Sequence, residues 1–444
     1  MADICVINAN VTPVHQVPLG PLLITAVLKE AGYGVEFRDY QTFRTDHKLS
    51  IDTFLTFLRQ ADSNIIGISA MCNSLPTVLG AVRRLKRDSP DKTIILGGPA
   101  ATDLPQSIMR RFPVDAIVVG EGERTIVDLL RALESGGDLD GVQGLCYRRR
   151  DGAIRMTPRR ARIPTLDDLP FPAYEEIDFA DYGPAAGIII TSRGCPFRCA
   201  FCSAHSVWQR SVSERSAANV TEEAVLLSRR VDRLVFVDDT LVLNAKRVES
   251  LLQALRAAGV DKPWRCNARI GLMSDHLLRL MADHGCEEVF YGIESGSNQV
   301  LRAIRKGFTI EMARREVERT LRYIPKVTTS YVWGFPFETM DDFYETVMAI
   351  AQDAQMEGVR PQVGLLSPLP KSPLYREYRR CVRFSPELNP RVMLPSPESL
   401  ADYPDITGLI VDYPQLFSPF YYYDHSDLDR KSAVMARITR ETAG

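Results

Sequence analysis

Three closely spaced cysteines are the most reactive feature of this sequence. Cys195, Cys199 and Cys202 form the pattern C-x3-C-x2-C, whereas the other cysteines of the nine are scattered. Three thiolates ligate only three irons of a four-iron cubane, which leaves one iron open for another ligand. The alternative is a zinc site with His205 as a fourth ligand, although zinc favours closed sites built from paired C-x2-C knuckles. The spacing therefore predicts a metal centre.

Alternating strands and helices must position this motif. From residue 187 to residue 375, short apolar segments alternate with helical patterns, which is typical of a parallel barrel or an open part of one. The six predicted strands cover residues 188–192, 234–238, 264–269, 288–294, 328–334 and 362–366, and the cysteine motif follows the first of them. Functional side chains gather at the carboxyl ends of barrel strands. The candidates at these ends are Asp238, Asp239, Arg269, Glu294 and Gly334.

The first part of the chain, residues 1–147, also alternates but predicts a different architecture. Apolar segments at 4–8, 35–39, 65–69, 93–96 and 116–119 alternate with helical patterns, which indicates a doubly wound parallel sheet similar to a Rossmann fold. Gly97 and Gly98 follow one predicted strand, and Gly120, Glu121 and Gly122 follow another. Open α/β sheets bind ligands at these strand ends. A dinucleotide is disfavoured as the ligand because no G-x-G-x-x-G follows the first strand.

Two further regions complete the predicted organisation. Residues 148–186 are rich in proline and are expected to form a connector. The basic sequence at 148–152 fits an exposed hairpin turn better than a phosphate-binding patch. Residues 376–444 are expected to form a C-terminal capping region, in which the aromatic segment 417–423 packs rather than recognises substrate.

The cysteine motif, with Phe201 before the third cysteine, resembles the C-x3-C-x-aromatic-C motif of the radical S-adenosylmethionine (SAM) superfamily. The resemblance implies a [4Fe-4S] cluster on Cys195, Cys199 and Cys202, with SAM bound to the open iron and cleaved to a 5′-deoxyadenosyl radical. It also implies SAM contacts: Phe201 and the Gly334 turn near adenine, Asp238 or the better aligned Asp239 at the amino group, Arg269 at the carboxylate and Glu294 at the ribose. Phe337 replaces a glycine that is common in that turn.

Each residue at a strand end also has a structural alternative. Asp238 fits a helix N-cap, Arg269 a structural ion pair and Glu294 a hydrogen-bonding position at the barrel end. Their occurrence in order on successive strand ends, after the cysteine motif, favours the SAM site over three unrelated structural roles.

Residues 1–147 resemble the cobalamin-binding domain that precedes the barrel in one radical SAM subgroup, on segments 18–22, 67–69, 95–99 and 118–123. With the connector segment 169–172, the resemblance extends to about residue 375. It implies cobalamin binding by Ser69, Gly97, Gly98, Gly120, Glu121 and Gly122. His15 aligns with the cobalt ligand of the D-x-H-x-x-G motif, but the aspartate and glycine are missing, so a loop histidine facing solvent is expected.

Composition excludes other function classes. The 54 Lys and Arg residues nearly balance the 56 Asp and Glu residues, which disfavours a nucleic-acid or anionic-membrane partner. No apolar segment approaches the roughly 18 to 20 residues of a membrane span, and the start lacks the basic and apolar regions of a signal peptide. A cytoplasmic protein is therefore expected.

The subgroup resemblance implies methylation of an unactivated carbon in a small-molecule or peptide substrate, for example in natural-product biosynthesis. Methylcobalamin would supply the methyl group, and an external one-electron donor such as flavodoxin or ferredoxin would reduce the cluster. A radical cyclisation, rearrangement or oxidation without net methyl transfer uses the same cofactors and stays an alternative. A cobalamin sensor without catalysis is disfavoured because it has no need of the cysteine motif.

Overall fold

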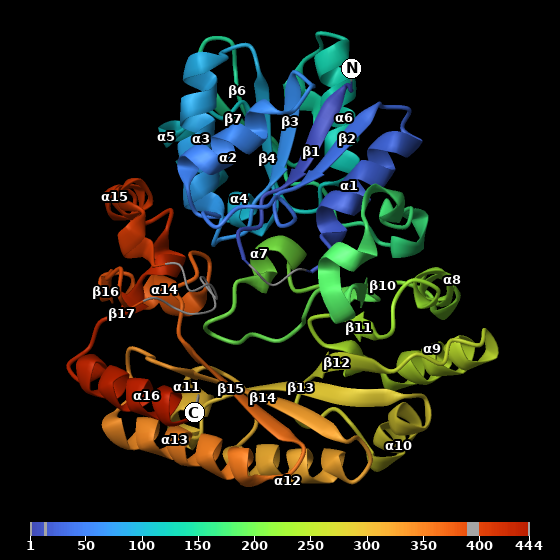
Figure 1. Cartoon of the computed structure of the whole chain (residues 1–444), viewed down its shortest axis with the longest axis vertical. Coiled ribbons are helices and arrows are strands. Elements are labelled where there is room, and N and C mark those ends of the chain that lie inside the picture. Colours follow the sequence, from blue (N-terminus) through green and yellow to red (C-terminus); the bar gives the residue numbers. More distant parts are fainter. Residues whose placement is uncertain (1, 13–15, 389–398, 443–444) are drawn as a thin grey trace.

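The framework of the molecule is two largely parallel β-sheets, one above the other in Figure 1. The computed structural model describes residues 2–12, 16–388 and 399–442. The first sheet has the strand order β2-β1-β3-β4-β5-β6-β7, and the second has the order β15-β14-β13-β12-β11-β8. The predicted α/β class, with a Rossmann-like sheet followed by a partial parallel barrel, is confirmed.

The first sheet is doubly wound. Its parallel strands are β1 (Ile4–Asn8), β2 (Val35–Asp39), β3 (Ile65–Ser69), β4 (Thr93–Gly97) and β5 (Ala116–Val118). Helices α2 (Ile51–Arg59), α3 (Leu75–Asp88) and α5 (Pro105–Arg111) contribute to one core, and α1 (Leu19–Glu30) and α6 (Glu123–Glu134) to the other. The chain reverses its direction of winding between β1 and β3, where sheets of this kind bind ligands at their carboxyl ends.

An antiparallel hairpin extends this sheet beyond residue 147. Strands β6 (Leu145–Arg148) and β7 (Ile154–Met156) pair with each other, and β6 pairs with β5. The basic segment forms the turn, in which the backbone N–H of Arg149 donates to the Ala153 carbonyl at 2.8 Å and Gly152 has a φ of 85°. The expected exposed hairpin turn is therefore present. The division of the chain after residues 147, 186 and 375 stays a prediction.

The second sheet is open within the described residues, because its edge strands β8 (Gly187–Ile189) and β15 (Val359–Leu365) do not pair. Between them lie β11 (Leu234–Phe236), β12 (Trp264–Ala268), β13 (Cys286–Glu294) and β14 (Lys326–Trp333). The helices along it are α8 (Ala217–Ser228), α9 (Ala245–Ala257), α10 (Asp275–Asp283), α11 (Asn298–Ala303), α12 (Ile310–Leu321) and α13 (Met340–Gln355). The side chain before each of these helices accepts a hydrogen bond from a backbone N–H of the first turn, as Thr339 Oγ1 does from the backbone N–H of Asp342.

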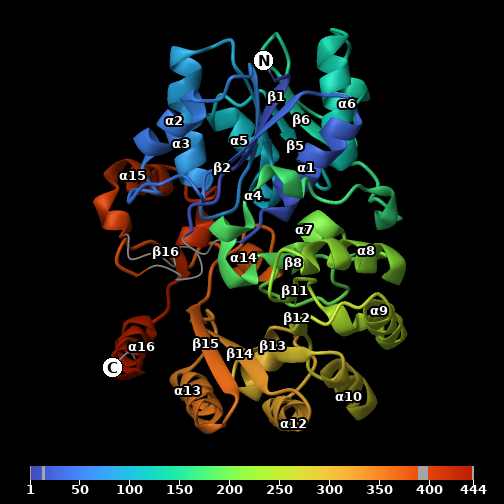
Figure 2. The same ribbon diagram turned by 45° about the vertical axis from the view of Figure 1, so that its right-hand side comes forward.

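The C-terminal region touches both halves of the molecule. Helix α15 (Pro404–Asp412) packs against α3, whereas α16 (Leu428–Thr442) lies beside the second sheet, as Figures 1 and 2 both show. The aromatic segment between them is buried: Phe417 and Phe420 belong to the N-terminal core and Tyr423 to the barrel core. This burial agrees with the packing role predicted for the segment. Smaller elements here are α14 (Pro373–Tyr378), β16 (Val382–Arg383) and β17 (Tyr422–Tyr423).

The connector contacts both halves of the molecule, because its Tyr182 belongs to the barrel core and also bonds to the first sheet. Tyr182 donates a hydrogen bond of 2.6 Å to the buried carboxylate of Asp39, at the end of β2.

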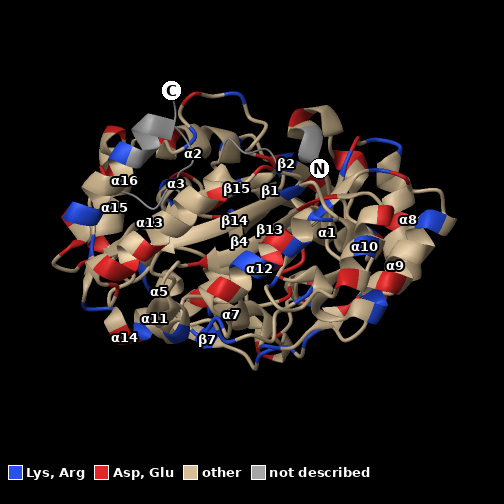
Figure 3. Cartoon of the chain, turned by 90° about the horizontal axis from the view of Figure 1, so that it is seen from below, with Lys and Arg blue, Asp and Glu red and all other residues tan. Residues whose placement is uncertain are grey.

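Viewed from the barrel side, basic and acidic segments are interspersed along the ribbon (Figure 3). Of the helices in the described part of the chain, none combines the length and the apolar character needed to cross a membrane.

Candidate active site

The cysteine loop, residues 194–212, connects the two strands of a short antiparallel ribbon. Strands β9 (Ser192–Arg193) and β10 (Ser213–Glu214) pair at its base, and helix α7 (Ala204–Trp208) lies within it. Gly194 has a φ of 104°, and a side chain there would collide with the carbonyl oxygen of Ser211. The two ends of the loop therefore touch, and only glycine fits at this contact.

The cysteines suit a cluster better than a single metal ion. All three are partly exposed, free thiols. Among the described residues, no three His, Cys, Asp or Glu side chains converge closely enough to hold one metal ion. A cubane places its cysteine ligands on separate irons, so its thiolates lie farther apart than the ligands of one ion. Burial raises the pKa of Cys202 to about 11, so its thiolate form depends on a bound cation.

The two neighbouring aspartates after β11 have different surroundings. Asp238 is 1% exposed and accepts hydrogen bonds from the hydroxyls of Thr191 (2.8 Å) and Ser192 (2.5 Å). It therefore fixes the base of the cysteine loop and does not cap a helix. Asp239 is exposed, and its negative charge contributes to raising the pKa of the Cys195 and Cys202 thiols. Of the two carboxylates, only that of Asp239 is accessible to a ligand beside the loop.

Arg269 extends from the end of β12 toward the cysteine loop. Its guanidinium lies 3.8 Å from the ring centre of Phe197 and donates to the Cys199 sulfur at 3.7 Å. It also donates to the carbonyl of Lys306. Arg269 forms no ion pair with a carboxylate among the described residues, so the structure does not support the alternative of a structural ion pair. Its charge is therefore available to an anionic group next to the cluster.

Glu294, at the end of β13, is buried and has a φ of 79°, in the left-handed region that a glutamate rarely adopts. Its Oε1 lies 3.1 Å from the Nζ of Lys306, which is also buried. The ammonium lies 5.9 Å from the ring centre of Phe201. Lys306 was not predicted as a site residue. It follows α11 rather than a strand end, so the barrel pattern gave no signal for it.

The turn after β14 is fastened to the C-terminal helix. Gly334 has a φ of 89° and donates to Glu338 Oε2 at 3.1 Å. Lys431 on α16 lies 3.1 Å from the same oxygen, and both side chains of this ion pair are fully buried. Phe201 packs edge-on to Phe335 in the turn, with ring centres 6.4 Å apart. The predicted adenine residues Phe201 and Gly334 therefore belong to one local structure.

A cavity of about 690 Å³ lies between the first sheet and the cysteine loop. All six of the described residues that were predicted to bind cobalamin line it, namely Ser69, Gly97, Gly98, Gly120, Glu121 and Gly122. Its walls also include connector residues 169–172 and the loop residues from Cys202 to Ala204. Gly98 has a φ of 92°, and a Cβ there would lie 2.8 Å from the Ala70 carbonyl oxygen. His15 lies outside the described residues.

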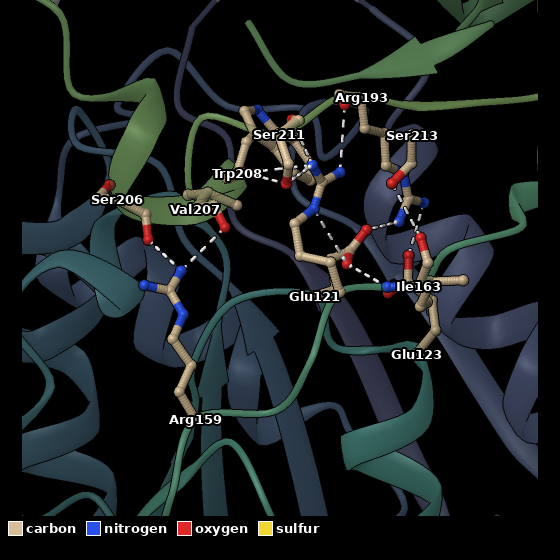
Figure 4. Close-up of polar contacts among 11 residues, drawn as sticks. Glu121, Glu123, Arg159, Ile163, Arg193, Ser206, Val207, Trp208, Ser211 and Ser213 are labelled. Atoms are coloured by element: carbon tan, nitrogen blue, oxygen red, sulfur yellow. Dashed lines mark hydrogen bonds and ion pairs between the residues drawn. The ribbon is translucent and has the colours of Figure 1, made fainter. Parts of the chain in front are cut away.

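The carboxylate of Glu121 is not free for a ligand, although the residue lines the cavity. Figure 4 shows it among arginine side chains. Its Oε1 lies 2.9 Å from Arg193, and its Oε2 accepts from the backbone of Ile163 at 2.9 Å and lies 3.5 Å from Arg162. Burial lowers the pKa of Arg193, but Glu123 and Glu121 outweigh this and raise it overall. These ion pairs connect residues some 70 positions apart, so the sequence did not predict them.

Comparison with known proteins agrees with this architecture. The family model for the radical SAM superfamily matches residues 189–350, and the model for the B12 binding domain matches residues 4–130. An uncharacterized methyltransferase of Pyrococcus horikoshii is 31% identical over 305 residues, which cover 67% of this chain and 66% of the relative. The anaerobic magnesium-protoporphyrin IX monomethyl ester cyclase of Rubrivivax gelatinosus is 26% identical over 367 residues, covering 80% and 65%.

Solved structures show the same fold. The radical SAM methyltransferase TsrM from Kitasatospora setae, with tryptophan and a SAM analog bound, superposes with a TM-score of 0.73 at 19% identity, covering 97% of this chain and 87% of TsrM. The fold and the matched domains thus define a radical SAM enzyme with a B12-binding domain. The chain belongs to the cobalamin-dependent radical SAM family, whose cofactors are a [4Fe-4S] cluster, SAM and cobalamin. It spans about two thirds of the length of the two relatives named above.

Proposed function

We propose that this enzyme transfers a methyl group from cobalamin to an unactivated carbon of a small-molecule or peptide substrate. The observation that carries the proposal is a cavity that is bounded both by the carboxyl end of the first sheet and by Cys202 of the cysteine loop. A methyl donor in this cavity would face the site at which SAM is cleaved. That adjacency suits a reaction in which hydrogen removal and methyl transfer occur at one carbon atom.

In this proposal, residues of the chain bind SAM and orient it for the reaction. In the proposed complex, Asp239 would accept hydrogen bonds from the SAM amino group, and Arg269 would pair with the SAM carboxylate. Glu294, partly neutralised by Lys306, would accept hydrogen bonds from the ribose hydroxyls. When bound, the cluster and SAM supply the 5′-deoxyadenosyl radical, and cobalamin supplies the methyl group. Connector residues such as Phe171 form part of the cavity wall.

Further parts of the proposal concern partners. Reduction of the cluster needs an external one-electron donor, for which flavodoxin or ferredoxin is suitable, and a reducing cytoplasm is the fitting compartment. The competing activity is a radical cyclisation without net methyl transfer. The similarity to the magnesium-protoporphyrin ester cyclase, over 80% of this chain, favours keeping it as the second candidate.

Product analysis distinguishes the two activities. The full chain is reconstituted anaerobically with iron, sulfide, cobalamin and SAM, and is assayed with candidate substrates and a chemical reductant. Methylation predicts S-adenosylhomocysteine and 5′-deoxyadenosine in step with a methylated product. Formation of 5′-deoxyadenosine with an unmethylated, altered substrate would refute methyl transfer and support the cyclase.

Cysteine variants test the cluster itself. Replacing Cys195, Cys199 and Cys202 with alanine should remove the visible absorbance of the cluster and all 5′-deoxyadenosine formation. Cys381→Ala is the matched control, because Cys381 is an exposed free thiol in the C-terminal region. Retention of the absorbance in the triple variant would contradict the assignment.

A further inference from the structure

Arg193 links the cysteine loop to the loop that leads into α6 (Figure 4). One guanidinium nitrogen lies 2.9 Å from Glu121 Oε1, and another lies 2.6 Å from Glu123 Oε1. The side chains of Arg193, Glu121 and Glu123 are only 11%, 6% and 8% exposed. Charge pairs shielded from water to this extent are screened little by salt and hold their partners in defined positions.

The link acts on the base of the cysteine loop rather than on its tip. Arg193 is two residues before Cys195 and lies in the ribbon that closes the loop. Arg162 of the connector reinforces the base, because it donates to the carbonyl of Arg193 at 3.2 Å and to the hydroxyl of Ser211 at 3.0 Å. Both ends of the loop are therefore held in one network with Glu121.

Glu123 has one carboxylate oxygen that no other described residue contacts through a hydrogen bond. Its Oε1 is paired with Arg193, but its Oε2 is buried and has no hydrogen-bond partner among the described residues. The residue is 7% exposed and lines the cavity between the sheet and the loop. A buried carboxylate oxygen without a donor is costly, so this atom is suited to a ligand that brings one. Both oxygens of Glu121, by contrast, already have partners.

We propose that Glu123 both binds cobalamin and positions the cluster loop. Its Oε2 accepts a hydrogen bond from a donor of the cobalamin periphery, a primary amide or a ribose hydroxyl, while its Oε1 holds Arg193. Cobalamin in the cavity and the cysteine loop are thus fixed to the two oxygens of one carboxylate. The inference rests on the cofactor arrangement of the proposed function and adds the residue that sets the separation between the two cofactors.

Cobalamin affinity tests the first half of this inference. In Glu123→Gln, the single amide oxygen can accept from Arg193, which leaves an NH2 group toward the cavity that cannot accept from cobalamin. The Kd for hydroxocobalamin, measured by equilibrium dialysis on the cluster-loaded protein, should rise about tenfold. Glu134→Gln, an exposed position at the other end of α6, is the matched control and should leave the Kd unchanged. A Kd for Glu123→Gln within twofold of the wild type would overturn the inference.

Electron paramagnetic resonance tests the second half. In the holoenzyme, the reduced cluster should broaden the cob(II)alamin signal by spin–spin coupling, to an extent set by the distance between the two centres. Arg193→Met should change this broadening, because a loosened cysteine loop would give a range of distances between the two centres. Arg193→Lys, which keeps the charge and one ion pair, should show a broadening close to that of the wild type. Arg233→Met removes a half-exposed pair with Glu287 and serves as the control. Unchanged broadening in Arg193→Met would refute the positioning role.

These measurements need no methyl acceptor. If no substrate is methylated but the affinity and the broadening change as expected, methyl transfer is wrong and the Glu123 link stands. If methylation is observed but neither quantity changes, the link is wrong and the proposed function stands.

Discussion

Replacing Lys431 with methionine should loosen the turn after β14. The ammonium of Lys431 lies 3.1 Å from Glu338 Oε2, donates to the Glu338 carbonyl at 2.5 Å, and is fully buried with its partner. Burial raises the pKa of Glu338 even beside this cation, so without it the carboxylate would have to take up a proton or stay charged and unpaired. Breaking one partner of a buried pair costs about 3–5 kcal/mol. We expect a loss of that size in the local unfolding free energy.

Hydrogen exchange followed by mass spectrometry measures this loss where it occurs. Peptides from β14 through the turn and from α16 should exchange roughly two to three and a half orders of magnitude faster in Lys431→Met, since each 1.4 kcal/mol is tenfold. Lys246→Met, at an exposed position of α9, is the control. In the double variant Lys431→Met/Glu338→Gln, most of the protection should return because no buried charge is left. Equal exchange in the single and double variants would refute the reasoning.

Three more predictions concern a pair of glycines, a pair of aspartates and the buried Asp39. Gly97→Ala should leave stability unchanged, because a Cβ there meets no protein atom, but the added methyl group in the cavity wall should weaken cobalamin binding. Gly98→Ala should lower the unfolding free energy measured by urea denaturation by about 1–3 kcal/mol, because Gly98 has a positive φ. Equal stabilities of the two variants would contradict this prediction. Asp239→Asn should raise the KM for SAM about tenfold with little loss of stability, because Asp239 is exposed. Asp238→Asn should chiefly lower the stability of the fold, because Asp238 is buried and hydrogen-bonded. The reverse pattern would refute the assignment. Burial raises the pKa of Asp39, so its protonated form favours folding. The unfolding free energy of the wild type relative to Asp39→Asn should therefore be highest below about pH 3.9, fall as pH rises through the raised pKa, and then level off; a pH-independent difference would contradict it.

Much of the fold could be predicted because its signals are local. The predicted bounds of β1, β2 and β3 match those of the structure, since strands in a largely buried parallel sheet form short apolar segments between helical patterns. The cysteine loop and the strand-end residues after it were also predictable. Barrel topology brings the carboxyl ends of successive strands to one side, so position along the chain indicates position in space.

The rest of the site depends on contacts between residues that are distant in sequence. Glu338 and Lys431 are 93 positions apart, and Glu123 and Arg193 are 70 positions apart. Nothing in the spacing of such charges distinguishes a buried pair from solvated residues, because burial is created by the packing of other elements around them.

The sequence by itself thus determined the two-part architecture, the cysteine motif and its open iron, and the glycine-rich strand ends where a second cofactor fits. Only the tertiary structure decided which carboxylates are available. Of two adjacent aspartates, Asp238 is enclosed by hydroxyls and Asp239 is accessible. Of two nearby glutamates, Glu121 has partners for both oxygens, whereas one oxygen of Glu123 has no hydrogen-bond partner among the described residues. Residue type sets what a carboxylate can bind, but its free energy of binding depends on the partners that the folded chain already provides.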